Sequence, residues 1–201
     1  MARLPVPTHE PPAEVQRALE ATRRGMAQLT GRDLEAGLEP LHMYAHVPGL
    51  LSGIGALEGA TAQLHGLDRR LNALAQLKAA TLTSCEFCID LGSNVGRQWG
   101  LTDKEMLALP AYRLSGLFSE VENLVLDYAV GMTRTPVDVP DELFAALRRH
   151  LDEAQLVELT HLIAIENMRG RFNLALGIGA AGFSEGMVCA VPEPVPSVVC
   201  C

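Results

Sequence analysis

The chain is organised around the stretch Thr81-Leu-Thr-Ser-Cys-Glu-Phe-Cys-Ile-Asp-Leu-Gly92. Its two cysteines, Cys85 and Cys88, are three positions apart and share one face if the segment is helical. They are then close enough to form a disulfide or to bind one metal ion together. The alternative is that both are core cysteines, since cysteine packs as a small hydrophobe. We favour chemistry, because the pair stands at a predicted helix start in an otherwise cysteine-poor stretch.

The residues around the pair predict its place in a helix. Thr83 and Glu86 form a capping-box pattern, which predicts a helix beginning at Thr83, with Ser84 as the alternative cap. Either cap puts Cys85 in the first turn, where exposed amides and the helix dipole favour an ionised thiolate. We therefore expect Cys85 to be the more reactive sulfur and Cys88, one turn deeper, to be its resolving partner.

The composition indicates one domain and excludes two classes of partner. The 201 residues suit a single core with tails, and a formal net charge of −8 without a basic stripe argues against nucleic acid. No run approaches the roughly 18 apolar residues of a membrane-spanning helix. The first ten residues lack the apolar centre of a signal peptide. We therefore expect no membrane partner and a cytoplasmic location, where a disulfide is more often catalytic than structural.

Apolar spacing and capping signals predict an all-α chain, because no strand-like run bounded by turns occurs. Helices are expected at 12–29, on both sides of Pro48 within 38–66, from Asp68 to the cysteine segment, at 83–99, 102–110 and 119–133, from Pro140 through Leu147, and at 153–177. We predict an N-terminal arm at 1–11, one helical domain at 12–185 and an extended C-terminal tail at 186–201.

Two further features bear on assembly and on repeats. Hydrophobic residues make up 48% of the chain, so apolar surface left after folding would have to meet another subunit, which predicts a homo-oligomer. Residues 67–92 and 151–177 both begin Leu-Asp and close on similar phrases, Phe-Cys-Ile-Asp-Leu-Gly and Phe-Asn-Leu-Ala-Leu-Gly. A duplicated two-helix unit and a coincidence between leucine-rich helices both explain this similarity.

Five phrases, in order along the chain, carry a family likeness. They are Leu67-Asp-Arg-Arg-Leu, Cys85-Glu-Phe-Cys88-Ile-Asp-Leu, Asp141-Glu-Leu-Phe-Ala-Ala-Leu, Leu156-Val-Glu-Leu-Thr and Arg171-Phe-Asn-Leu-Ala-Leu-Gly177. Over roughly residues 40–185 the chain resembles the carboxymuconolactone decarboxylase family, in its alkylhydroperoxidase D-like branch. The resemblance implies a compact multi-helix bundle, a homo-oligomer and a Cys-x-x-Cys pair that reduces hydroperoxides, with a thiol or dithiol as reductant. We expect no bound cofactor or metal.

The likeness is incomplete at the site it implies. The family's redox pair falls on Cys85 and Cys88, our candidate catalytic residues. Its relay histidine, four residues after the second cysteine, falls on Gly92, and its relay glutamate falls on or near Ala73, so neither position can transfer a proton. Because general-base assistance contributes about 10²–10⁴-fold, we predict a slow thiol-dependent peroxidase or disulfide oxidoreductase.

Two alternatives to this enzyme stay open at this point. The absent relay favours a non-catalytic helical oligomer that binds a small ligand in a subunit cleft. His42 and His46 share a helix face and could complete a tetrahedral zinc site with Cys85 and Cys88.

Other polar residues could contribute to the site. Glu158 and His161 could replace the relay if the last long helix packs on the cysteine helix, although such a pair is more often solvated. The polar residues within 166–173 indicate first a subunit contact or a buried hydrogen-bond network, and second substrate contacts. Cys189, Cys200 and Cys201 are expected to be bystanders.

Overall fold

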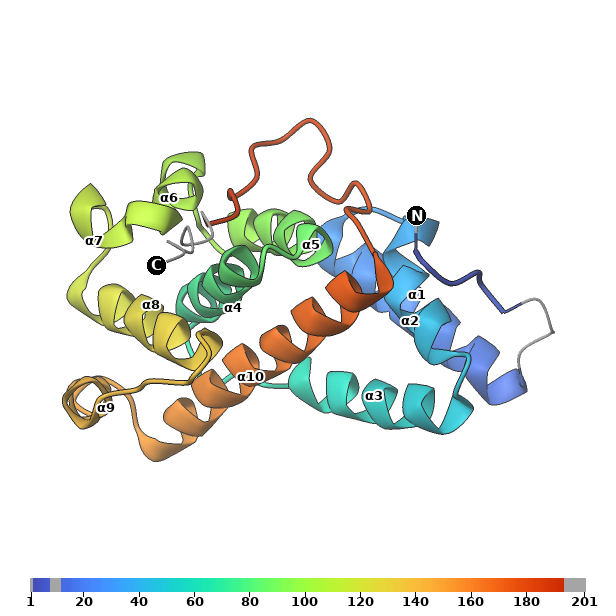
Figure 1. Cartoon of the computed structure of the whole chain (residues 1–201), viewed down its shortest axis with the longest axis horizontal. Helices are drawn as coiled ribbons and strands as arrows, with labels where there is room; N and C mark the ends of the chain where they lie inside the picture. The colour runs from blue at the N-terminus through green and yellow to red at the C-terminus, as the bar shows by residue number, and fades with distance from the viewer. Residues whose placement is uncertain (1, 8–11, 194–201) are drawn as a thin grey trace, which may run out of the picture.

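The computed structural model describes residues 2–7 and 12–193, which fold into helices and connecting loops without a strand among them (Figure 1). The predicted all-α class is therefore confirmed. In chain order the elements are α1 (Ala13–Thr30), the 3-10 helix η1 (Glu35–Leu38), α2 (Glu39–Tyr44), α3 (Pro48–Thr61), α4 (Arg69–Thr83), α5 (Glu86–Gln98), α6 (Asp103–Ala108), the 3-10 helix η2 (Leu109–Ala111), α7 (Tyr112–Ser115), α8 (Glu120–Thr133), α9 (Asp141–Leu147) and α10 (Glu153–Leu176).

Local capping explains why four of the helices begin where the sequence predicts. The Asp68 carboxylate accepts the backbone N–H groups of Arg70 and Leu71 at the start of α4. Full capping boxes open α6, α8 and α10 at Thr102, Ser119 and Asp152. Each cap satisfies backbone donors that the helix itself leaves without partners, which fixes the first turn.

Helix α4 lies at the centre of the bundle. It packs against α5, α8 and α10, and Figure 1 shows it enclosed by these helices. Leu77 and Ala79 are almost completely buried although they lie on opposite sides of α4 and belong to different hydrophobic clusters. Burying a leucine side chain stabilises the fold by roughly 1.5–3 kcal/mol, so contacts on several faces of α4 hold the bundle together.

Three hydrophobic clusters divide the interior. One joins α4 and α5 to the segment after α10 and contains both cysteines. A second joins α4, α8 and the first half of α10, and a third lies between α1, α2 and α3. The cysteine pair therefore belongs to a packed core cluster, beside the most enclosed helix.

The two similar sequence segments fold differently. Residues 67–92 bend at Ser84, whose φ is 56°, and so form α4 and α5. The matching residues 151–177 form the single 24-residue helix α10, which ends at Gly177. The similarity therefore does not mark a repeated two-helix unit.

The segment that follows α10 is bound along α5. The Asp90 carboxylate accepts four backbone N–H groups, those of residues 181–184, at 2.7–3.0 Å. Further along, the Glu193 carboxylate forms an ion pair with the buried ammonium of Lys78. At the other end, Arg3 donates its backbone N–H to the Leu176 carbonyl at 2.7 Å. The described parts of the predicted arm and tail thus contact the helices, while the domain boundaries themselves stay a prediction.

Within the described ranges, no helix has both the length and the hydropathy needed to span a membrane.

Candidate active site

Cys85 and Cys88 are joined by a disulfide at the junction of α4 and α5, with their Cα atoms 5.2 Å apart. This separation lies within the usual range for a disulfide. The pair is held from both sides, because α4 ends two residues before Cys85 and α5 begins one residue after it.

The cap of α5 is Cys85 itself, so the capping box predicted at Thr83 was wrong. The Thr83 hydroxyl donates to the Ala79 carbonyl at 3.0 Å and is thus used within α4. Ser84 takes the left-handed conformation that ends α4, which excludes it as a cap. The Cys85 sulfur then accepts the backbone N–H of Cys88 at 3.3 Å, as a capping oxygen would.

A third side chain, Asn173 of α10, contacts the disulfide. Its Nδ2 atom lies 3.7 Å from the Cys85 sulfur and 3.7 Å from the Cys88 sulfur, and the residue is only 3% exposed. The sequence placed Asn173 in a polar group that was expected first at a subunit contact or in a buried hydrogen-bond network, and second in contact with substrate. The available signal was a polar residue inside an apolar helix, in the phrase that resembles the cysteine phrase.

Opposing effects act on the charge of these sulfurs. Cys85 is completely buried and Cys88 is 6% exposed, and burial disfavours an ionised thiolate. The Cys88 N–H and the Asn173 amide both point at sulfur, and hydrogen bonds to the charged form favour it. The site can therefore hold negative charge on sulfur in spite of its burial.

The positions of the absent relay are filled by packing. A Cβ atom on Gly92 would lie 3.1 Å from a methyl group of Leu77, so this part of the contact between α4 and α5 is tight. Ala73 is 6% exposed and belongs to the same core cluster as the cysteines. Both positions serve the packing of α4 against α5.

The four predicted zinc ligands do not come together. The His46 ring contacts the Pro5 carbonyl at 2.9 Å, and the His42 ring lies 3.8 Å from Glu35. Across the described chain, no three His, Cys, Asp or Glu side chains form a group that could hold a metal ion. The zinc alternative is therefore not supported.

Glu158 and His161 do not replace the relay either. The Glu158 carboxylate accepts the backbone N–H groups of Gly66 and Leu67, at 3.0 and 3.1 Å, and the His161 ring contacts the Thr61 hydroxyl at 2.8 Å. Glu158 precedes Asn173 by 15 residues on α10, which places it about 22 Å away along the helix axis. These two residues hold the loop before α4 and the end of α3.

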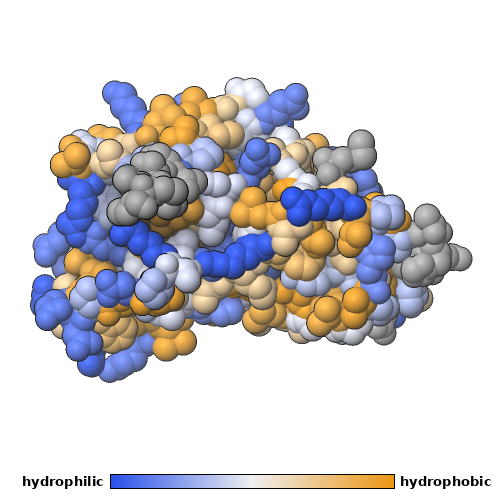
Figure 2. Space-filling view, in the orientation of Figure 1, coloured by the Kyte–Doolittle hydropathy of each residue, from blue (hydrophilic) through white to orange (hydrophobic). Residues whose placement is uncertain are grey.

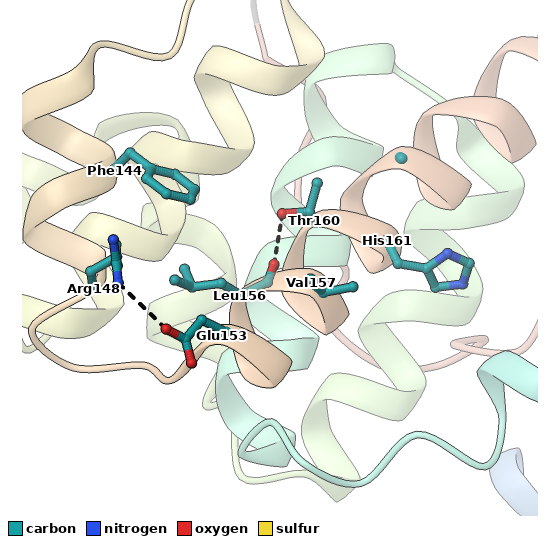
Figure 3. Close-up of a pocket in the computed structure, with 8 residues that line it drawn as sticks. Phe144, Arg148, Glu153, Leu156, Val157, Thr160 and His161 are labelled. Atoms are coloured by element: carbon teal, nitrogen blue, oxygen red, sulfur yellow. Dashed lines mark hydrogen bonds and ion pairs between the residues drawn. The ribbon is translucent and has the colours of Figure 1, made fainter.

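A shallow groove lies on the same distant half of α10. It encloses about 590 Å³ between α9 and α10, and its lining is mostly apolar. Figure 3 shows Phe144 of α9 and Leu156 of α10 pointing into it, with Val157 and His161 further along α10. None of its lining residues contacts the disulfide, so the groove is separate from the cysteine site.

The polar residues of α10 form a partly buried hydrogen-bond network, which belongs to the first of the two interpretations from the sequence. Arg169 donates to Glu58, Glu166 and Gln76. Burial raises the pKa of Glu166, although the charge of Arg169 acts in the opposite direction. This network ties α3 and α4 to α10 and so fixes the helix that carries Asn173.

Comparisons with known proteins agree with this fold. The model of the carboxymuconolactone decarboxylase family matches residues 48–130. The uncharacterised protein YnjA of Escherichia coli strain K12 is 34% identical over 172 residues, which cover 85% of this chain and 91% of YnjA.

Two solved structures share the fold. The debrominase Bmp8 in complex with 2,3,4-tribromopyrrole has a TM-score of 0.71 at 22% identity, over 90% of this chain and 95% of Bmp8. An alkylhydroperoxidase AhpD core from Ralstonia eutropha JMP134, an uncharacterised peroxidase-related protein, has a TM-score of 0.70 at 20% identity, over 96% and 98% of the two chains. At these identities the likeness shows the fold alone.

Proposed function

Because the chain belongs to the carboxymuconolactone decarboxylase family, we propose that it is a thiol-dependent redox enzyme of the alkylhydroperoxidase D-like branch. In this proposal Cys85 and Cys88 cycle between a dithiol and a disulfide. The oxidant is a hydroperoxide or a disulfide, and the reductant is a thiol or dithiol. A cytoplasmic location, as the composition predicts, is part of the proposal.

The observation that carries the proposal is the contact of two hydrogen-bond donors with the disulfide sulfurs. The Cys88 N–H and the Asn173 amide lie 3.3 and 3.7 Å from the Cys85 sulfur. These donors would stabilise Cys85 when it leaves as a thiolate, and stabilising the leaving thiolate speeds thiol–disulfide exchange. A purely structural disulfide in a core would not need them.

The exposure of the two residues favours Cys88 as the cysteine that meets external molecules, because 6% of the surface of Cys88 is exposed and none of Cys85. During reduction, an incoming thiolate would attack Cys88, and Cys85 would leave as the stabilised thiolate. This order reverses our expectation from the sequence, in which Cys85 attacks first. During oxidation by a hydroperoxide, the Cys88 thiolate would attack oxygen, the O–O bond would break and an alcohol would leave after taking up a proton. Cys85 would then attack the Cys88 sulfenic acid, release water and close the disulfide.

Mass spectrometry of the reduced chain tests the proposal. Treatment with hydrogen peroxide or oxidised glutathione should remove two hydrogen atoms from the peptide that contains Cys85 and Cys88, and dithiothreitol should restore them. The Cys189→Ser variant should behave like the wild type, because Cys189 has no role in the pair. If both thiols stay unmodified with both oxidants, the chain is better explained as the non-catalytic ligand-binding oligomer.

We also propose a homo-oligomer, supported by the exposed apolar residues of α3. Leu50 and Leu57 are 57% and 38% exposed, and Cβ atoms on Gly53 or Gly55 would meet nothing within 4 Å. Figure 2 shows hydrophobic surface along the lower edge of the molecule, where α3 lies in Figure 1. Light scattering should give a mass above that of one chain, and Leu50→Glu should reduce it. A monomeric wild-type chain would contradict this assembly.

A further inference from the structure

The donors around the disulfide are directed at sulfur. The Cys88 N–H contacts the Cys85 sulfur, and the Asn173 amide contacts both sulfurs. In the part of the chain that the structure describes, no His, Asp or Glu side chain joins the two cysteines in a cluster of three. Within the described chain, the hydrogen bonds to these sulfurs thus come from a backbone N–H and a side-chain amide, which stabilise a charged sulfur but are not acids.

The nearest carboxylates along the chain are directed elsewhere. The Asp90 carboxylate accepts four backbone N–H groups of residues 181–184, so both of its oxygens are bound to that segment. Glu86 is exposed, and one of its oxygens lies 3.4 Å from where a Cβ atom of Gly179 would be. The nearby Thr83 hydroxyl donates to the Ala79 carbonyl. These groups are therefore unsuited to protonating a leaving group at the sulfurs.

These donors should stabilise the reaction with a disulfide more than the reaction with a hydroperoxide. In thiol–disulfide exchange the negative charge stays on sulfur from the attacking atom to the leaving atom. Fixed donors on sulfur can therefore stabilise the charge at each stage. In hydroperoxide reduction the charge moves onto oxygen, where these donors do not point.

The basicity of the leaving groups also favours a disulfide over a hydroperoxide as the oxidant. A thiol has a pKa of about 8.5, so a thiolate can leave without an acid. The pKa of water lies far above that of a thiol, so hydroxide or an alkoxide is strongly basic and its departure needs a proton. A positioned acid typically contributes about 10²–10⁴-fold to such a step.

We infer that the oxidising substrate of this site is a disulfide rather than a hydroperoxide, an inference that rests on the proposed function. The Cys88 thiolate attacks one sulfur of the substrate, its S–S bond breaks and the first thiolate leaves. The Cys85 thiolate then attacks Cys88, expels the second thiolate and closes the protein disulfide. The dithiol is oxidised by two electrons, the substrate is reduced to two thiols, and the two protons pass from the protein thiols to the products.

Single-turnover oxidation of the reduced full-length chain tests the substrate class. Oxidised glutathione and hydrogen peroxide are used at equal concentrations, samples are quenched in acid, and closure of the Cys85–Cys88 disulfide is measured by mass spectrometry. The second-order rate with oxidised glutathione should exceed that with hydrogen peroxide by at least about tenfold. Asn173→Ala should lower the rate with oxidised glutathione and so reduce the ratio of this rate to the rate with hydrogen peroxide. Asn167→Ala, a buried asparagine on the same helix that binds Thr133, should leave the ratio unchanged.

The outcomes separate this inference from the proposed function. Equal rates, or a faster rate with hydrogen peroxide, would overturn the disulfide preference while the redox function stands. Failure of both oxidants to close the disulfide would overturn the redox function as well. The wild-type ratio decides the substrate class even if Asn173→Ala does not fold, which circular dichroism would reveal.

Discussion

The Asn173 side-chain amide lies 3.7 Å from the Cys85 sulfur, although 88 residues separate them in the chain. Helix α10 brings this amide to the start of α5, where it meets both cysteines. The contact gives the disulfide a donor that its own Cys-x-x-Cys segment cannot supply.

Replacing Asn173 by leucine should slow reduction of the disulfide. Leucine has a similar size but no N–H group, so the departing Cys85 thiolate loses a donor in a buried site. A hydrogen bond to a charged group contributes about 1.5–3 kcal/mol, which corresponds to roughly tenfold or more in rate. Stopped-flow reduction by dithiothreitol measures the change, and Asn167→Leu on the same helix is the matched control. An unchanged rate would show that Asn173 serves packing only.

Single-cysteine variants should show which sulfur is accessible. Cys85→Ser keeps the slightly exposed Cys88, whereas Cys88→Ser keeps the fully buried Cys85. With oxidised glutathione, Cys85→Ser should form the mixed disulfide several-fold faster, because Cys88 can be approached. Intact-mass spectrometry over time measures the adduct. Faster modification of Cys88→Ser would restore the order expected from the sequence.

A histidine at position 92 should raise hydroperoxide reduction. A Cβ atom on Gly92 would lie 3.1 Å from a methyl group of Leu77, a tight contact, so Gly92→His is combined with Leu77→Ala to make space. If the ring reaches the sulfurs, proton transfer could add about 10²-fold to the peroxide rate with little effect on the disulfide rate. Leu77→Ala alone is the control for the lost packing. A double variant with the control's peroxide rate would show that the absent histidine is not what limits the reaction.

Replacing Arg70 by methionine should destabilise the chain most at neutral pH. Arg70 forms ion pairs with Glu105 and Glu122. Burial opposes ionisation of both carboxyls, but hydrogen bonds from Arg70 and from the helix caps outweigh it and lower the pKa of each. Because the folded pKa values lie below the unfolded value of about 4.3, this stabilisation is present above pH 4.3 and is lost as the pH falls through the folded values.

The expected loss for Arg70→Met is about 1–3 kcal/mol at pH 7. The difference from the wild type should shrink in acid. Urea unfolding at pH 7 and at a pH below the folded pKa values of Glu105 and Glu122 measures this difference in the free energy of unfolding. Arg69→Met is the control, because the neighbouring Arg69 forms no ion pair among the described residues. A difference that is constant with pH would contradict an electrostatic origin.

The helix ends could be predicted wherever a cap and its helix are neighbours in the chain. Asp68, Thr102, Ser119 and Asp152 all cap as expected, since each binds N–H groups two or three residues away. The same reasoning failed at Thr83, whose hydroxyl binds the preceding helix turn. Which of the two neighbouring helices takes the hydroxyl depends on how α4 and α5 pack, and a local pattern does not contain that information.

By itself, the sequence determined the all-α class, most helix ends and the spacing of the two cysteines, because these depend on residues within about one helix turn of each other. The tertiary structure alone decided that Asn173 contacts both sulfurs, that Glu158 and His161 lie far from them, and that the histidines do not join the cysteines. Those relationships arise from the packing of α4 against α5 and α10, which unites side chains far apart in the chain.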